Sequence, residues 1–170
     1  MAIVVEDGSV VAGANSYASV AQLEAYADLR GITLPAETVE KERLLIRAMD
    51  YLEGRLYDYP GTRVSPTQPL PWPRSYAYVE GVYIDHLTIP AVLIEAQLDI
   101  AANSVGLNLM GVQAPQSKGA VTQETVGPVS VSYAAPDPGA RTMPFFPRAD
   151  VLLARLMGYS GYRPLSVRKA

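Results

Sequence analysis

The sequence has no cysteine and one histidine, His86, among its 170 residues. Without cysteine there is no disulfide framework and no thiolate nucleophile, and a single histidine nearly excludes a zinc site built from imidazoles. No run approaches the ~20 apolar residues that a membrane-spanning helix needs. No basic residue precedes the apolar start MAIVV, unlike in a signal peptide. These absences predict a soluble protein without an export signal.

Motifs for phosphate binding and for nucleophilic catalysis are also missing. The chain contains no GxxxxGK[ST], GxGxxG or GxSxG. A serine nucleophile would need His86 as its base, but the position of His86 beside Asp85, before a predicted helix, is typical of a surface residue. The acids Glu37, Glu40 and Glu42 alternate with bases near a helix start, as on a solvated face. We therefore expect a protein that is not an enzyme, with no catalytic residue, cofactor or metal ligand.

Positive charge is scarce as well, because the net charge is −3. Residues 1–60 hold ten acids and five bases, whereas residues 119–170 hold three acids and six bases. The overall balance disfavours nucleic acid as the main partner. The acidic front and basic end are either solvated faces or complementary surfaces for neighbouring copies and unlike partners.

Four segments have the periodicity of helices: 16–31, 36–54, 88–110 and 148–157. In the first, Ser19 and Gln22 match a capping box. In the third, Thr88 is the expected cap and Pro90 lies in the first turn. That third segment is apolar nearly all round, which predicts a central helix with neighbours on several sides.

The rest of the chain is rich in proline and glycine, most of all in residues 55–88. Alternating residues around Gly127-Pro128 predict a β-hairpin at about 118–133. The predicted fold is mainly α: a small helical bundle of three main helices plus a short C-terminal helix, with a β-hairpin, long Pro/Gly-rich loops and an extended C-terminal tail. One domain is expected over residues 1–158, followed by a basic, aromatic tail over 159–170.

The stretch QPLPWPR holds the only tryptophan, Trp72, between Pro71 and Pro73. It could stack on bases, serve as a polyproline ligand, or fasten the long loop to the core. Burial of an indole removes some 150–250 Å² from water, worth several kcal/mol by area. We therefore predict that Trp72, with Pro71, Pro73 and Arg74, anchors the loop to the bundle.

The aromatic content keeps single-stranded nucleic acid open as a partner. Eleven tyrosines, together with Trp72 and Arg74, could supply stacking faces over a cationic groove. Tyr26 and Tyr51 lie on helical stripes and are expected in the core. The tyrosines that flank Trp72 suit a protein interface equally well; they are Tyr57, Tyr59, Tyr76, Tyr78 and Tyr83.

The order of several segments resembles a known family. ANSYASVAQLEAYADLRG, LLIRAMDYLEG, LPWPR, IPAVLIEAQLDIA and ETVGPVSVSY resemble, in this order, tailed-bacteriophage head–tail connector proteins, also called adaptor or head-completion proteins. Some members of that group carry the label of primosomal-type ssDNA-binding proteins. The resemblance covers roughly residues 14–135.

The resemblance implies a structural protein of the virion neck, assembled in the host cytoplasm. It implies a ring, dodecameric in this group, that sits on the portal protein, extends the channel for packaged DNA without sequence-specific binding, and docks the next neck or tail protein; no membrane is involved. The implied portal contacts are Tyr159, Tyr162, Arg163, Pro164, Leu165, Val167, Arg168 and Lys169. The implied contacts between subunits are Val121, Val126, Val129, Val131 and Tyr133. The alternative function is a single-stranded DNA-binding replication accessory protein.

Overall fold

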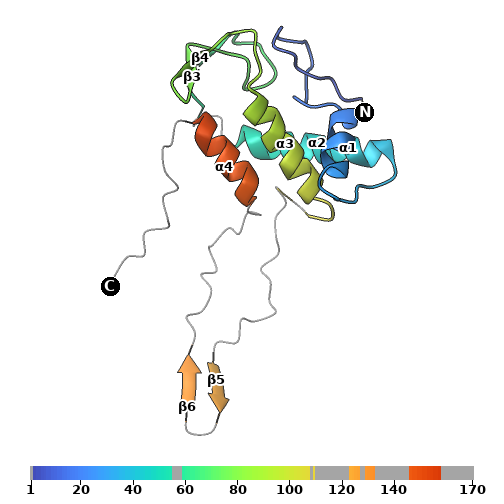
Figure 1. The fold of residues 1–170 in the computed structure, drawn as a ribbon, viewed down its shortest axis with the longest axis vertical. Coiled ribbons are helices and arrows are strands. Elements are labelled where there is room, and N and C mark those ends of the chain that lie inside the picture. The colour runs from blue at the N-terminus through green and yellow to red at the C-terminus, as the bar shows by residue number, and fades with distance from the viewer. Residues whose placement is uncertain are drawn as a thin grey trace.

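The computed structural model of the chain describes residues 2–54, 59–107, 109, 123–126, 129–132 and 146–157. The elements are, in order, α1 (Val20–Asp28), α2 (Thr38–Glu53), β1 (Thr62–Arg63), β2 (Arg74–Ser75), β3 (Ala77–Val79), β4 (Val82–Ile84), α3 (Ala91–Asn103), β5 (Gln123–Val126), β6 (Val129–Ser132) and α4 (Pro147–Leu156). The fold is mainly helical with short antiparallel pairs, which confirms the predicted fold class (Figure 1). The predicted tail at 159–170 lies outside the described residues.

Helices α1 and α2 form where their sequence signals place them. Ser19 caps α1 through the predicted capping box: its side chain accepts from the Gln22 N–H, and the Gln22 side chain accepts from the Ser19 N–H. Helix α1 ends at Asp28, three residues before Gly31, whose φ of +64° turns the chain away. A glycine after a helical pattern predicts the end of the helix, and Gly54, the last residue of segment 36–54, is the C-cap of α2.

Helix α3 is central, because it contacts α1, α2 and α4. The prediction of Thr88 as its cap was wrong. The N-cap is Pro90, whose ψ of 131° keeps it extended. Thr88 lies before the helix, where its N–H donates to the Asp85 carbonyl. Gln97 is fully buried on this helix. Its amide accepts from the Tyr17 N–H at 2.9 Å and donates to the Ser16 hydroxyl and the Leu45 carbonyl. Gln97 thereby joins α3 to α2 and to the segment before α1.

Helix α4 packs along α3 (Figure 1). Its buried stripe consists of Ala149, Leu152, Leu153 and Leu156. The sequence pattern of 148–157 predicts Val151, Leu152 and Leu156 on the inner face. For Val151 this prediction was wrong, since its side chain is 52% exposed. Positions 149, 152, 153 and 156 follow the three- and four-residue spacing of one helical face, which excludes position 151.

The loop predicted for residues 55–88 contains more structure than its sequence pattern indicates. Two short antiparallel pairs form in it: Thr62 pairs with Ser75 in β1–β2, and Tyr78 pairs with Tyr83 in β3–β4. A third pair, β5–β6, falls inside the predicted 118–133 hairpin, and in Figure 1 it lies apart from the four helices.

Candidate functional site

Trp72 brings the long loop into contact with the buried core. Its side chain is 0% exposed, and its ring meets Tyr59 edge-on at 6.4 Å between centroids. The Trp72 N–H donates to the Tyr17 hydroxyl at 2.9 Å, and the pKa of Tyr17 is raised well above its usual value by burial. The next peptide bond, Trp72–Pro73, is cis. Because the Tyr17 N–H donates to Gln97, this contact runs from the loop to α3.

Arg74 holds the opposite side of the same loop. Its guanidinium donates to the carbonyls of Pro60 and Gly61, each at 2.6 Å, and more weakly to those of Tyr59 and Pro71 at 3.4 Å. Burial lowers the pKa of this guanidinium from its usual value, with the charge of Arg63 as the second cause. Backbone carbonyls thus satisfy a buried cation, and residues 59–61 are held beside β2.

The β3–β4 hairpin projects from this anchored loop. Its turn is Glu80-Gly81, with φ of +53° and +81°, the pattern of a two-residue primed turn. Ala77 is buried, and Val79 and Ile84 pack on the core cluster. Because side chains alternate across a strand, Tyr78 and Tyr83 face outward as a directly opposed pair.

The outward face of this hairpin is aromatic. Tyr78 and Tyr83 lie edge to face, 5.6 Å between centroids with planes at 63°. We name the tyrosine ribbon by its three exposed aromatic side chains: Tyr76 (78%), Tyr78 (59%) and Tyr83 (49%). Exposed aromatics that lie together are suited to stacking or to a partner surface.

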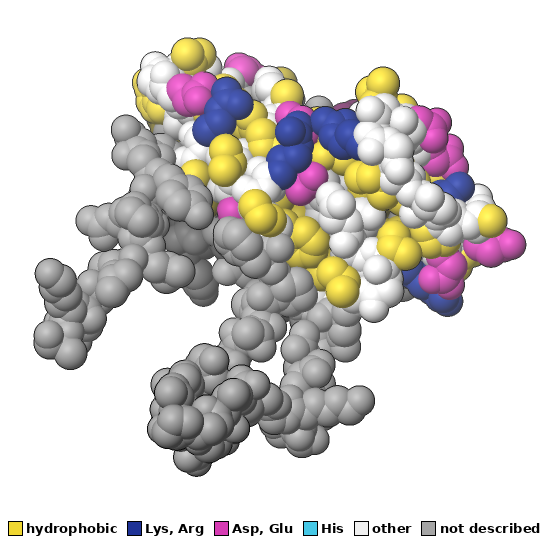
Figure 2. Space-filling model, turned by 60° about the horizontal axis from the view of Figure 1, so that its bottom comes forward, with side chains coloured by type: hydrophobic (Ala, Val, Ile, Leu, Met, Phe, Trp, Pro, Cys, Tyr) yellow, Lys and Arg dark blue, Asp and Glu magenta, His cyan; other side chains and the backbone are white. Residues whose placement is uncertain are grey.

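Charges around the tyrosine ribbon largely cancel. Arg155 of α4 contacts the Glu80 carboxylate at 2.8 and 3.2 Å, which lowers the pKa of Glu80. Asp85 lies 3.7 Å from the His86 ring. Arg63 is exposed on β1 and makes no ion pair in the described residues. Basic and acidic side chains are likewise interspersed on the face that Figure 2 shows.

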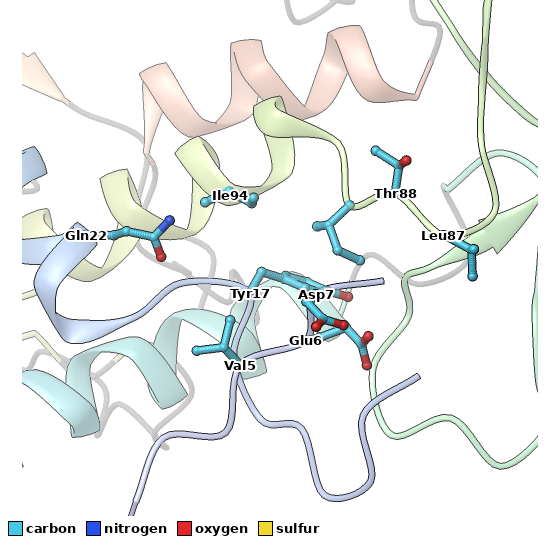
Figure 3. Close-up of a pocket in the computed structure, with 9 residues that line it drawn as sticks. Val5, Glu6, Asp7, Tyr17, Gln22, Leu87, Thr88 and Ile94 are labelled. Atoms are coloured by element: carbon cyan, nitrogen blue, oxygen red, sulfur yellow. The ribbon is translucent and has the colours of Figure 1, made fainter. Parts of the chain in front are cut away.

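A hollow of about 400 Å³ lies between the N-terminal segment and the start of α3 (Figure 3). Val5, Glu6, Asp7, Tyr17, Gln22, Leu87, Thr88, Ile89 and Ile94 line it. The Glu6 carboxylate is already engaged, since it accepts from the N–H groups of Gly8, Val10 and Val11. Asp7 accepts from Ser9, which lowers the pKa of Asp7. These carboxylates stabilise a loop, so the hollow offers no free acid–base pair.

The structure brings only some of the predicted site residues together. Trp72, Pro71, Pro73 and Arg74 form one buried cluster. Of the proposed subunit contacts, Val126 and Val129 pair in the β5–β6 register and Val131 lies opposite Glu124, whereas Val121 and Tyr133 lie outside the described residues. All eight proposed portal contacts also lie outside them. Three flanking tyrosines, Tyr76, Tyr78 and Tyr83, gather on the exposed ribbon, while Tyr59 is buried.

Two further features concern the described residues as a whole. No group of three or more His, Asp or Glu side chains there could hold a metal ion. No helix there has the length and apolarity to cross a membrane.

The comparisons with known proteins give one match. The sequence model of the family described as "Putative DnaT-like ssDNA binding protein" matches residues 1–169. No curated protein matches, and no solved structure matches.

Proposed function

Because the chain belongs to the family of DnaT-like ssDNA-binding proteins, we propose that it binds single-stranded DNA through the tyrosine ribbon. The observation that carries this proposal is the exposed Tyr78–Tyr83 pair on a hairpin whose other face is fixed to the core. Unpaired bases offer flat faces that stack on aromatic rings, and each stacked base contributes about 1–3 kcal/mol. No catalytic step and no cofactor are part of the proposed function.

The surroundings of the ribbon favour binding by stacking over binding by charge. Arg155 is paired with Glu80, whereas Arg63 on β1, whose partner strand β2 directly precedes Tyr76, is exposed and makes no salt bridge in the described residues. Binding should then tolerate many sequences, because every base has a stacking face. Trp72 takes no part, since its ring is fully buried.

The test is a titration of fluorescently labelled oligo(dT) with the protein, followed by anisotropy. The double substitution Tyr78→Ala/Tyr83→Ala should weaken binding by at least about 5-fold, the loss of one stacked base. Leu29→Ala is the matched control, because Leu29 is 84% exposed at the end of α1, outside the ribbon. Equal affinity of wild type and the double variant would overturn the ribbon as the site. Absence of binding by wild type would overturn the function itself.

A second candidate function is the virion neck adaptor that the segment order implies. The observation that favours it is β5–β6, a two-stranded ribbon with no further strand on either edge in the described part of the chain. Open strand edges are ready to pair with a neighbouring chain. A ring subunit needs two unlike lateral faces, and a hairpin that reaches a neighbouring copy would supply one of them. On this proposal the ring sits on a portal protein, extends the DNA channel and docks the next neck or tail protein.

Electron microscopy of the purified protein mixed with its cognate portal protein tests this second candidate. The expected result is a closed ring on the portal, dodecameric by the resemblance. The proposal would be contradicted if the protein stays monomeric over a range of concentrations, as measured by light scattering, and does not bind the portal protein. The two functions can be tested separately, because one assay measures binding to oligo(dT) and the other measures assembly on the portal protein.

A further inference from the structure

Tyr76 has an unusual backbone conformation for its residue type. Its φ is +57°, although it carries a bulky side chain and lies outside the Glu80-Gly81 turn, between β2 and β3. Positive φ is strained for residues other than glycine, asparagine and aspartate. Its ring contributes little burial to offset that strain, because the side chain is 78% exposed.

The neighbouring backbone fixes this conformation. Gly61 lies against the two residues that flank Tyr76: a Cβ on Gly61 would stand 2.3 Å from the Ser75 carbonyl oxygen and 2.9 Å from the Ala77 nitrogen. The Arg74 guanidinium in turn holds the Gly61 carbonyl at 2.6 Å. Strand β2 therefore ends at Ser75, which pairs with Thr62, and the chain bends at position 76.

We infer that Tyr76 is a third stacking residue of the ssDNA site, held in place before binding by Gly61 and Arg74. This inference rests on the proposed function. An exposed aromatic in a strained conformation gains nothing for the fold, and such strain concentrates at binding and active sites, where the surrounding structure maintains it. The Tyr76 side chain is exposed directly before β3, the strand that carries Tyr78. A ring fixed in advance loses less side-chain freedom on binding than a mobile one.

Tyr76→Gly separates this role from a structural one. Glycine accepts positive φ without strain, so the variant should raise Tm by about 2–4 °C. The same variant should weaken oligo(dT) binding by about 5- to 150-fold, the loss of one stacked base. Tyr76→Phe should keep wild-type affinity, because it keeps the ring.

The matched control is Tyr78→Gly, which removes a ring of the ribbon at a regular strand position and should lower Tm. A Tyr76→Gly variant that binds oligo(dT) as tightly as wild type, while Tyr78→Ala/Tyr83→Ala binds more weakly, would overturn the role of Tyr76 and leave the proposed function intact. A lower Tm for Tyr76→Gly would also overturn it, since the residue would then be structural. Absence of oligo(dT) binding by wild type would overturn both.

Discussion

Trp72 combines a large buried apolar surface with a buried polar atom that has no partner. Its Nε1 finds no hydrogen-bond acceptor in the described part of the chain, and a buried donor without a partner costs about 1–3 kcal/mol. We expect Trp72→Ala to lower the free energy of unfolding by ~3–5 kcal/mol, because it leaves a cavity beside Tyr59. Trp72→Phe should cost clearly less, because it keeps most of the ring and removes the unpaired N–H.

Urea denaturation measures both changes from the shift in midpoint at constant slope. Equal losses for the alanine and phenylalanine variants would contradict this expectation, because the retained phenyl ring would then recover none of the lost packing. A Trp72→Ala variant as stable as wild type would contradict the anchor itself.

For single residues, the sequence predicts burial better than it predicts contacts. The burial of Trp72 could be predicted from the apolar area of its side chain. The identity of the residues that contact it could not be predicted. The contact between its N–H and the Tyr17 hydroxyl spans 55 residues, and Gln97 reaches Tyr17 across 80. A polar residue such as Gln97 gives no periodic signal that would predict full burial, because hydrogen-bond partners distant in sequence satisfy it.

At the scale of elements, α4 shows which forces hold a helix on the bundle. Arg148 contacts Glu95 and lies 3.8 Å from Asp99, but it is half exposed. Exposed ion pairs contribute about 0–1 kcal/mol. Leu153 is fully buried on the same helix. We expect Arg148→Ala to cost less than about 1 kcal/mol and Leu153→Ala to cost about 2–5 kcal/mol, both by urea denaturation. The reverse order would mean that charges, not apolar packing, attach α4.

The C-terminal end of α2 carries unfavourable charge, since Asp50 and Glu53 lie there without a base in the last turn. Partial burial raises the pKa of Glu53, the charge of Asp50 raises it further, and the charge of Arg63 offsets part of this rise. The ionised carboxylate is therefore less favourable in the folded than in the unfolded chain at neutral pH. Glu53→Gln should stabilise the fold at pH 7 by a few tenths of a kcal/mol, a value limited by solvent screening.

The sign of this effect follows from linkage. With a folded pKa above the unfolded one, wild type gains stability relative to Glu53→Gln as the pH falls through the folded pKa. Below about pH 3 the carboxyl is protonated in both states, so the difference should vanish. Thermal unfolding of both proteins at the two pH values measures it, and a difference that persists at low pH would contradict the electrostatic cause.

The helices could be predicted from the sequence because their signals are local. The capping box at Ser19, Gly54 at the end of α2 and the apolar stripes set their limits within a few residues. The pairs β1–β2 and β3–β4 could not, since each strand is two or three residues long, too short for a period-2 pattern to be recognised in the sequence. Their register depends on Gly61 and Arg74, which act through contacts with distant backbone. The tyrosine ribbon was therefore visible only as a group of tyrosines near Trp72.

At the scale of the whole molecule, the pairing of charges determines how DNA binding responds to salt. The binding constant for a single strand falls with a slope of about −0.7 per phosphate neutralised, on logarithmic axes. Many exposed cations of the described residues already contact acids: Arg30 and Arg148 meet Glu95, and Arg155 meets Glu80. On strands β1–β4, within the described residues, Arg63 is the exposed arginine without a salt bridge. If the ribbon is the site, the slope should therefore be about −0.7.

The basic end of the chain supplies the decisive comparison, because residues 119–170 hold six bases and three acids. A triple variant tests this, in which glutamine replaces Arg163, Arg168 and Lys169. If the ribbon alone contacts DNA, the slope of this variant should equal that of wild type. Arg63→Gln should instead flatten it. Anisotropy titrations of labelled oligo(dT) between about 50 and 200 mM salt give both slopes. A flatter slope in the triple variant would place the phosphate contacts in the tail, and the net charge of −3 would then conceal a cationic binding segment.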